Sequence, residues 1–379
     1  NKHRFEGMWP LPYGVSYNSY LIDDEMVALV DTVDICYFEV YLRKIKQVIG
    51  ERPINYLIIN HMEPDHSGSI RLIKQHYPGI IIVGNKQTFG MIEGFYGVTG
   101  EQYLVKEGDF LALGHHKLRF YMTPMVHWPE TMMTFDETDG VLFSGDGFGC
   151  FGTVDGGFLD TRINVDKYWG EMVRYYSNIV GKYGSPVQKA LQKLGGLPIS
   201  AICSTHGPVW TENIAKVIGI YDRLSRYDAD EGVVIAYGSM YGNTEQMAEA
   251  IAEELSAQGV KNIVMHNVTK SHPSYIIADI FRYKGLIIGS PTYSNQIFPE
   301  VEALLSKILL REVKGRYLGY FGSFTWAGAA VKRLAEFAEK SKFELVGDPV
   351  EMKQAMKDLT YTQCENLARA MADRLKKDR

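Results

Sequence analysis

From Tyr13 to about Ala229 the hydrophobic pattern is that of short, β-branched strands with helical segments between them. The run Ile54-Asn55-Tyr56-Leu57-Ile58-Ile59-Asn60 is apolar and β-branched, which is typical of a buried strand. Helical spacing is found at 38–49, at 69–76 and over the longer stretch 168–194, and Gly and Asp turns separate these segments. The pattern predicts two sheets flanked by helices.

The pattern changes after the acidic segment Asp228-Ala229-Asp230-Glu231, which follows an expected connecting helix at 214–227. From there long strands and helices alternate and end in an amphipathic helix at 360–376. The expected strands are 232–237, 285–289 and 316–321, and the expected helices between them are 244–258, 301–310 and 327–342. Such alternation is typical of a doubly wound parallel sheet. We therefore expect two α/β domains, 1–228 and 229–379.

Composition sets limits on partners and location. A chain of 379 residues exceeds what one core usually organises, and its net charge of -5 is spread along the sequence without a basic stripe. Nucleic acid and anionic membranes are therefore not expected as partners. The four cysteines, Cys36, Cys150, Cys203 and Cys364, lie far apart, no apolar stretch approaches the length of a membrane span, and no signal-peptide pattern is seen, so we expect a cytoplasmic protein.

Metal-ligand residue types gather where predicted strands end. His61-Met62-Glu63-Pro64-Asp65-His66 directly follows the first buried strand and offers four potential ligands within six positions. His127, Asp146 and His206 each follow a later strand-like run. Alternate side chains of one loop can point at different places, so the pattern predicts a site for two metal ions.

A His-x-Glu-x-Asp-His loop with later His, Asp and His resembles the metallo-β-lactamase-like domain of the flavodiiron proteins. Glu63 stands where the wider superfamily has histidine, and the resulting oxygen-rich ligand set suits iron better than zinc. The resemblance implies one iron held by His61, Glu63 and His127 and a second held by Asp65, His66 and His206, with Asp146 bridging the two.

Three loops of the second domain place small, hydroxyl-bearing and aromatic residues at the ends of predicted strands. Backbone amides and hydroxyls of the first loop could surround a phosphate at a helix N-terminus, and aromatic rings in the others could stack on a flat ring. Taken alone, Tyr293 and Trp326 read as core packing. The loops are Ser239-Met240-Tyr241-Gly242-Asn243-Thr244, Pro291-Thr292-Tyr293-Ser294-Asn295 and Ser323-Phe324-Thr325-Trp326-Ala327-Gly328.

These three loops resemble those of flavodoxin and of the flavodiiron FMN domain. Tyr241 departs from the Thr that flavodoxins often carry in the phosphate loop. The resemblance covers essentially the whole chain and implies a flavodiiron oxidoreductase with two Fe ions and FMN. Such an enzyme reduces dioxygen to water, nitric oxide to nitrous oxide, or both. It further implies a head-to-tail homodimer, with a tetramer as the larger alternative, and an external electron donor, either rubredoxin or a reduced deazaflavin.

Other interpretations stay open from the sequence. Tyr176 is the candidate proton donor and its neighbour Tyr175 the alternative, although paired tyrosines in an apolar helix usually serve packing. The protein could instead be a metal-dependent hydrolase with a regulatory flavodoxin domain, or an electron carrier whose first domain kept only the fold. Glu63 argues against the hydrolase. The complete set of seven ligand positions argues against the electron carrier. The sequence does not distinguish a preference for dioxygen from one for nitric oxide.

Overall fold

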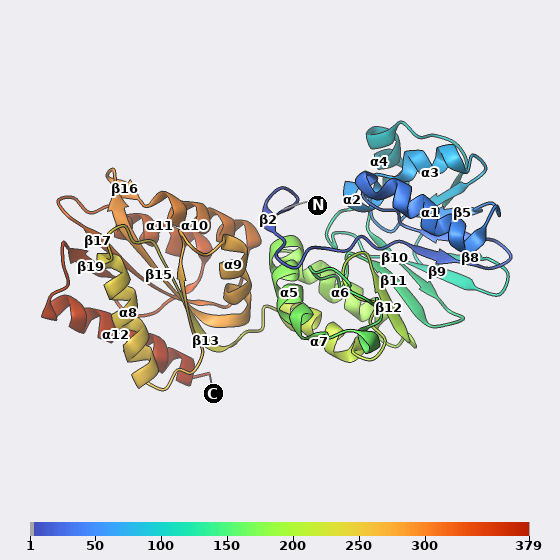
Figure 1. Ribbon diagram of the computed structural model, residues 1–379. Helices are drawn as coiled ribbons and strands as arrows, with labels where there is room; N and C mark the ends of the chain where they lie inside the picture. Colours follow the sequence, from blue (N-terminus) through green and yellow to red (C-terminus); the bar gives the residue numbers. More distant parts are fainter. Residues whose placement is uncertain (1–3, 379) are drawn as a thin grey trace. The chain divides into compact units, whose positions relative to one another are not determined.

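The chain folds into two compact units, Asn1–Ser225 and Arg226–Arg379, in a computed structural model that describes residues 4–378 (Figure 1). Each unit has its own hydrophobic core. The sequence places the domain boundary after residue 228. That boundary stays a prediction.

The first unit contains two five-stranded sheets after a short N-terminal hairpin, β1 (Arg4–Phe5) and β2 (Trp9–Pro10). The strand order is β3-β4-β5-β6-β7 in one sheet and β12-β11-β10-β9-β8 in the other. The strands are β3 (Tyr20–Ile22), β4 (Ala28–Val30), β5 (Tyr56–Ile58), β6 (Ile81–Gly84), β7 (Gln102–Leu104), β8 (Phe110–Ala112), β9 (Lys117–Met122), β10 (Met132–Asp136), β11 (Val141–Gly145) and β12 (Ala201–Ser204).

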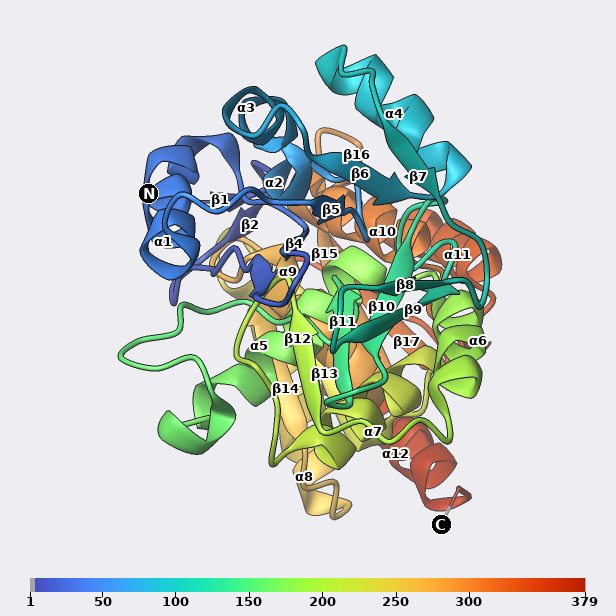
Figure 2. The ribbon, with the colours of Figure 1, turned by 90° about the vertical axis from the view of Figure 1, so that its right-hand side faces the viewer.

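Helices cover the outer faces of these two sheets. The helices are η1 (Ile35–Tyr37), α1 (Phe38–Ile49), α2 (Pro64–Ser67), α3 (Ile70–His76), α4 (Lys86–Tyr96), η2 (Asp160–Arg162), α5 (Asp166–Tyr175), η3 (Tyr176–Val180), α6 (Gly184–Leu194) and α7 (Ile214–Ser225). Figure 2 shows α5, α6 and α7 beside the second sheet, away from α1, α3 and α4. The predicted helices at 38–49 and 69–76 are confirmed as α1 and α3.

The two faces of the first sheet bury different partners because successive strand residues point in opposite directions. Leu57 belongs to the core under the apolar side of α1, whereas its neighbour Ile58 belongs to the core between the two sheets. The first unit is therefore a helix–sheet–sheet–helix sandwich, as predicted. Its strand ends open onto the loops that carry His61, Asp146 and His206.

The expected continuous helical stretch at 168–194 is wrong in one respect. Helix α5 ends at Tyr175 and passes into η3, a π-helix, and the chain then turns at Gly181, with φ of 13°, before α6 begins. The wider π turn rotates the following side chains relative to an α-helix. The spacing of apolar residues alone does not reveal such an insertion.

The second unit is a parallel sheet of order β14-β13-β15-β17-β18, with β19 also pairing with β17 and β16 antiparallel to β15. Its strands are β13 (Asp230–Tyr237), β14 (Ile263–Asn267), β15 (Tyr283–Tyr293), β16 (Gln296–Ile297), β17 (Tyr317–Phe324), β18 (Glu344–Leu345) and β19 (Val350–Lys353). Its helices are α8 (Asn243–Ala257), α9 (Pro273–Arg282), α10 (Pro299–Arg311), α11 (Ala330–Ser341) and α12 (Asp358–Lys376). This order, with the second strand outermost, is that of the flavodoxin-like fold.

Helices lie on both faces of this sheet, and α8 and α12 share one of them (Figure 1). Met247 of α8 and Met371 of α12 pack in one buried cluster with Ile235 and Ile287 of the central strands. The doubly wound sheet predicted for the second domain is confirmed. The loops after β13, β15 and β17 accordingly lie at the carboxyl edge, where such folds bind ligands.

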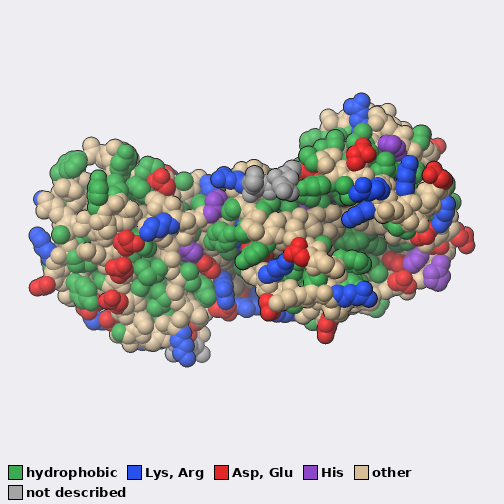
Figure 3. Space-filling model, viewed as in Figure 1, with side chains coloured by type: hydrophobic (Ala, Val, Ile, Leu, Met, Phe, Trp, Pro, Cys, Tyr) green, Lys and Arg blue, Asp and Glu red, His purple; other side chains and the backbone are tan. Residues whose placement is uncertain are grey.

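The charged surface agrees with the sequence. Figure 3 shows Lys and Arg side chains interspersed with Asp and Glu rather than gathered in one basic patch on that face. Within residues 4–378 no helix combines the length and apolar character needed to cross a bilayer.

Candidate metal centre and cofactor loops

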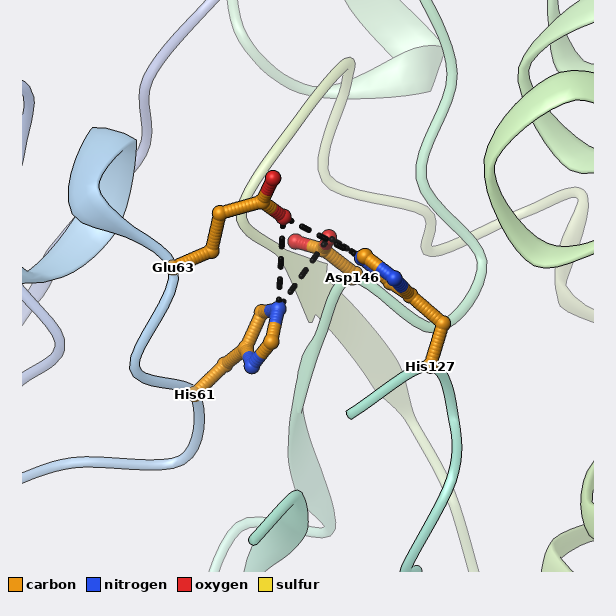
Figure 4. Close-up of side chains that lie close together, drawn as sticks. All are labelled: His61, Glu63, His127 and Asp146. Carbon is orange, nitrogen blue, oxygen red and sulfur yellow. Dashed lines mark hydrogen bonds and ion pairs between the residues drawn. The ribbon is translucent and has the colours of Figure 1, made fainter. Parts of the chain in front are cut away.

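Four buried side chains converge on one point in the first unit (Figure 4). His61 and Glu63 come from the loop after β5, His127 from the loop before β10, and Asp146 directly follows β11. Glu63 Oε2 lies 3.4 Å from His61 Nε2 and 3.1 Å from His127 Nε2, and Asp146 Oδ2 lies 3.1 Å from the same His127 nitrogen. We call these four residues the first cluster.

Three further ligand-type side chains, which we call the second cluster, are Asp65, His66 and His206. Asp65 and His66 lie in the short helix α2, which Pro64 begins, and His206 follows β12. Asp65 Oδ1 lies 3.2 Å from His66 Nε2, and Asp65 Oδ2 lies 3.3 Å from His206 Nε2. The seven positions predicted from the sequence thus form two groups.

Asp146 belongs to both groups because its carboxylate is shared. Oδ2 faces the first cluster, while Oδ1 lies 2.9 Å from His66 Nε2 and 3.8 Å from His206 Nε2. One carboxylate that presents an oxygen to each of two adjacent ligand sets is the arrangement expected of a bridging ligand.

The donor atoms fit two cations. Buried atoms without a hydrogen-bond partner among residues 4–378 include His61 Nε2, Glu63 Oε2, both Asp65 oxygens, His66 Nε2 and His206 Nε2. Buried polar atoms normally have partners, so a set of orphans aimed at two common points indicates ligands of its own. Each group offers two imidazoles and one carboxylate besides Asp146, a hard mixed set that suits iron.

Electrostatics at the site favours positive charge. Burial favours the neutral imidazole of His61, but Asp146, Glu130 and Glu63 outweigh it and raise the pKa of His61 well above its ordinary value. Burial also favours the neutral imidazoles of His66 and His127. Neighbouring carboxylates outweigh this effect and raise the pKa of each to about 9. Such a site stabilises a cation, whether a proton on each ring or a bound metal.

The groups that are hydrogen-bonded to the ligand residues were not predicted from the sequence. Glu130 is fully buried, and its Oε1 lies 2.8 Å from both His61 Nδ1 and the backbone nitrogen of Met62. His206 Nδ1 lies 2.7 Å from the backbone oxygen of Ser16, and the Thr205 hydroxyl donates to Asp146 Oδ1 at 2.6 Å. The closeness of Glu130 to His127 in the sequence was the one available signal.

The N-terminal hairpin was also missed. Phe5 packs edge-on against the His206 ring at 5.2 Å between ring centroids. Glu6 approaches Glu63, and burial together with the charge of Glu63 raises the pKa of Glu6 to about 7. Trp9 Nε1 donates to the Glu6 carboxylate at 2.9 Å. The hairpin therefore contributes an apolar and an acidic side chain beside the ligands.

The two tyrosines differ in their surroundings. The ring of Tyr175 lies 5.7 Å from the ring of His206, and burial and then the nearby Asp146 carboxylate raise the pKa of Tyr175 well above its ordinary value. Tyr176, the first candidate from sequence, packs its ring against Tyr221 at 5.1 Å. Contact with a ligand residue favours Tyr175 over Tyr176 as a proton donor.

The first loop of the second unit ends at α8. Gly242, with φ of 89°, precedes the helix, and its backbone nitrogen donates to the Ser239 hydroxyl at 3.1 Å. Thr244 Oγ1 lies 2.8 Å from Ser323 Oγ, which joins the first and third loops. The helix N-terminus and these hydroxyls form an environment suited to a phosphate.

The second and third loops are joined as well, since Thr292 Oγ1 accepts hydrogen bonds from the backbone nitrogens of Ala329 and Ala330. Three aromatic side chains on the loops are unusually exposed: Tyr241 is 90%, Trp326 82% and Tyr293 48% exposed. Their exposure excludes the core-packing interpretation and suits stacking on a flat ligand. The remaining predicted residues of the second and third loops are Pro291, Ser294, Asn295, Phe324, Thr325, Ala327 and Gly328.

Known proteins combine the same two parts. The model of the ODP family beta lactamase matches residues 15–207, and the flavodoxin model matches residues 235–366. An anaerobic nitric oxide reductase flavorubredoxin of Vibrio vulnificus is 33% identical over 336 residues, which cover 87% of this chain and 68% of that protein.

Two solved structures resemble the whole chain. The rubredoxin oxygen:oxidoreductase from the anaerobe Desulfovibrio gigas has a TM-score of 0.94 and 31% identity, covering 98% of this chain and 94% of that one. The flavodiiron protein from Giardia intestinalis has a TM-score of 0.92 and 26% identity, covering 100% and 94%.

Proposed function

The chain belongs to the flavodiiron family, and from this premise we propose that it reduces dioxygen to water, nitric oxide to nitrous oxide, or both. The observation that supports this most directly is the pair of ligand clusters that share Asp146, in one chain with a flavodoxin-like unit. His61, Glu63 and His127 would hold one iron, and Asp65, His66 and His206 would hold the second. Asp146, which presents one oxygen to each group, would serve both.

The three loops of the second unit would hold FMN: Ser239 and Thr244 would offer hydroxyls to its phosphate, and the exposed rings of Tyr293 and Trp326 would offer surfaces for stacking. When bound, FMN and the iron pair together hold the electrons that dioxygen needs to reach water. A metal-dependent hydrolase would have no use for this flavin site. The exposed aromatic loops therefore favour the oxidoreductase over the hydrolase alternative.

The residues of this chain exclude water and supply a proton. His61, His66, His206 and Asp146 are all buried, so charge at the ligands is poorly screened by solvent. The Tyr175 hydroxyl is buried without a partner among residues 4–378 and is the group we assign as proton donor. A phenol held neutral by its surroundings keeps its proton and can donate it to a basic oxygen of a bound substrate.

Electrons come from an external donor. The Desulfovibrio gigas relative is named rubredoxin oxygen:oxidoreductase. We propose rubredoxin as the electron donor here, with a reduced deazaflavin as the alternative. The working form is a head-to-tail homodimer, or a tetramer built from it, so that each iron pair receives electrons from a nearby FMN. We place the protein in the cytoplasm, where its four free cysteines would stay reduced.

The experiment is anaerobic. Protein loaded with iron and FMN is reduced with rubredoxin and its reductase, and dioxygen and nitric oxide consumption are followed separately on electrodes. We expect uptake of at least one gas without release of hydrogen peroxide. An enzyme that contains two irons and one FMN per chain yet consumes neither gas would contradict the proposal, and hydrolysis of an ester or lactam would then be tested.

A further inference from the structure

The two clusters offer the same kinds of direct ligand, imidazole and carboxylate, but differ in the groups that are hydrogen-bonded to those ligands. Each has two imidazoles and one carboxylate of its own, and they share Asp146. Groups that contact the ligands can make the two irons differ.

At the first cluster a ligand residue is hydrogen-bonded to a carboxylate that is not itself a ligand. His61 Nε2 faces Glu63, so the proton is on the other ring nitrogen, Nδ1. This N–H donates a hydrogen bond of 2.8 Å to Glu130 Oε1. The same oxygen accepts the backbone N–H of Met62, so Glu130 is held as an acceptor at this position. A carboxylate partner makes a ligating imidazole a stronger donor to its metal.

At the second cluster no carboxylate outside the ligand set is hydrogen-bonded to an imidazole among residues 4–378. His206 Nδ1 donates to the backbone oxygen of Ser16, and His66 Nδ1 is buried without a hydrogen-bond partner among residues 4–378. Moreover, the Thr205 hydroxyl donates to Asp146 Oδ1, the oxygen that faces His66 and His206. This hydrogen bond draws electron density from the oxygen facing the second cluster only.

Both differences act in the same direction. Building on the proposed function, we propose that Glu130 and Thr205 are positioning residues that split the reduction potentials of the two irons. Glu130 lowers the potential of the iron held by His61, Glu63 and His127, and Thr205 raises that of its neighbour. The half-reduced pair therefore has its ferric ion at the first cluster and its ferrous ion at the second.

The test uses the full-length protein with iron and FMN bound, and an electron paramagnetic resonance titration of the half-reduced diiron signal. The first electron enters the second cluster and the last electron enters the first. Glu130→Gln should therefore raise the lower potential and leave the upper one in place, while Thr205→Val should lower the upper potential and leave the lower one. In both variants the stability constant of the half-reduced form should fall about tenfold, which is about 59 mV for a one-electron couple.

Glu39→Gln, an exposed change on α1, is the matched control and should move neither potential. The inference is overturned if Glu130→Gln moves both potentials equally or moves the upper one, or if Thr205→Val moves the lower one. If Glu130→Gln does not retain iron, Thr205→Val alone decides the outcome, since it keeps every ligand and nearly the same side-chain volume. If the wild-type protein shows no diiron signal and consumes neither gas, the proposed function is contradicted instead.

Discussion

His66 Nε2 lies 2.9 Å from Asp146 Oδ1, while the second oxygen of that carboxylate lies 3.1 Å from His127 Nε2. Asp146 thus joins ligand sets that come from distant parts of the sequence. It is fully buried, and although burial raises the pKa of a carboxyl, His66, His127 and His61 hold the pKa of Asp146 well below its ordinary value. Its negative charge is accordingly retained for cations.

Asp146→Ala should weaken both iron sites at once, because one side chain serves both. We expect iron affinity to fall at least tenfold, the loss typical of a disrupted metal site, with FMN content unchanged. Iron and FMN per chain are measured after dialysis against a chelator. Glu39→Ala is the control, since Glu39 is exposed on α1 and belongs to neither cluster. Retention of both irons by Asp146→Ala would contradict the bridging role.

Tyr175→Phe should slow gas reduction by about 10²-fold, the lower range for loss of a general acid, without changing iron content. Tyr176→Phe, which alters a ring packed on Tyr221, should leave the rate nearly unchanged. Turnover is measured with both gases, and the solvent isotope effect on each variant reports the proton step. The opposite ranking of the two variants would restore Tyr176, the first candidate from sequence.

Much of the fold could be predicted because each element repeats a simple period. The helix at 38–49 buries Phe38, Leu42, Ile45 and Ile49 at helical spacing, and the sequence pattern predicts its limits. The π turn at Tyr176–Val180 has no such period, so the apolar spacing predicts one helix over 168–194. The two tyrosines at this junction were for the same reason not distinguished.

The metal ligands could be predicted because their order along the chain is specific. Glu130 could not, since one carboxylate among 45 acidic residues has no pattern that links it to His61. Glu6 was missed because a contact with Glu63 depends on how the N-terminal hairpin folds back over the loop. Interactions of this kind come from tertiary structure, and only the ligand types are visible in sequence.

Trp326→Ala should weaken FMN binding about fivefold, because loss of one stacking partner costs about 1 kcal/mol and each 1.4 kcal/mol is a factor of ten. Trp326→Phe should recover most of the affinity. The dissociation constant is measured from quenching of FMN fluorescence. Tyr361→Ala removes a partly exposed aromatic ring from α12 and should have no effect. Equal losses in Trp326→Ala and Tyr361→Ala would exclude a specific stacking role.

The pH dependence of the iron-depleted protein follows from its histidines. Carboxylates raise the pKa of His66 and of His127 to about 9 in the folded protein, against about 6.5 in an unfolded chain. A histidine whose pKa is higher in the folded state binds its proton more tightly there, which stabilises the fold. This stabilisation is fully present below pH 6.5 and is lost as the pH rises through 9. We therefore expect the free energy of unfolding of the chelated protein to fall across this window by at least about 1 kcal/mol, the size of one pKa unit.

Iron should reverse this slope, because it binds neutral imidazoles and displaces their protons. Relative to the chelated protein, iron-loaded protein should gain stability from pH 6.5 to 9, and adding ferrous iron near pH 7.5 should release protons that an indicator dye detects. Denaturant unfolding at each pH gives both curves. Asp146→Asn removes one of the charges that hold the protons, so its iron-depleted form should show a shallower fall. An iron-depleted wild type whose stability is flat or rises between pH 6.5 and 9 would show that these histidines are neutral, and the electrostatic account of the site would then be wrong.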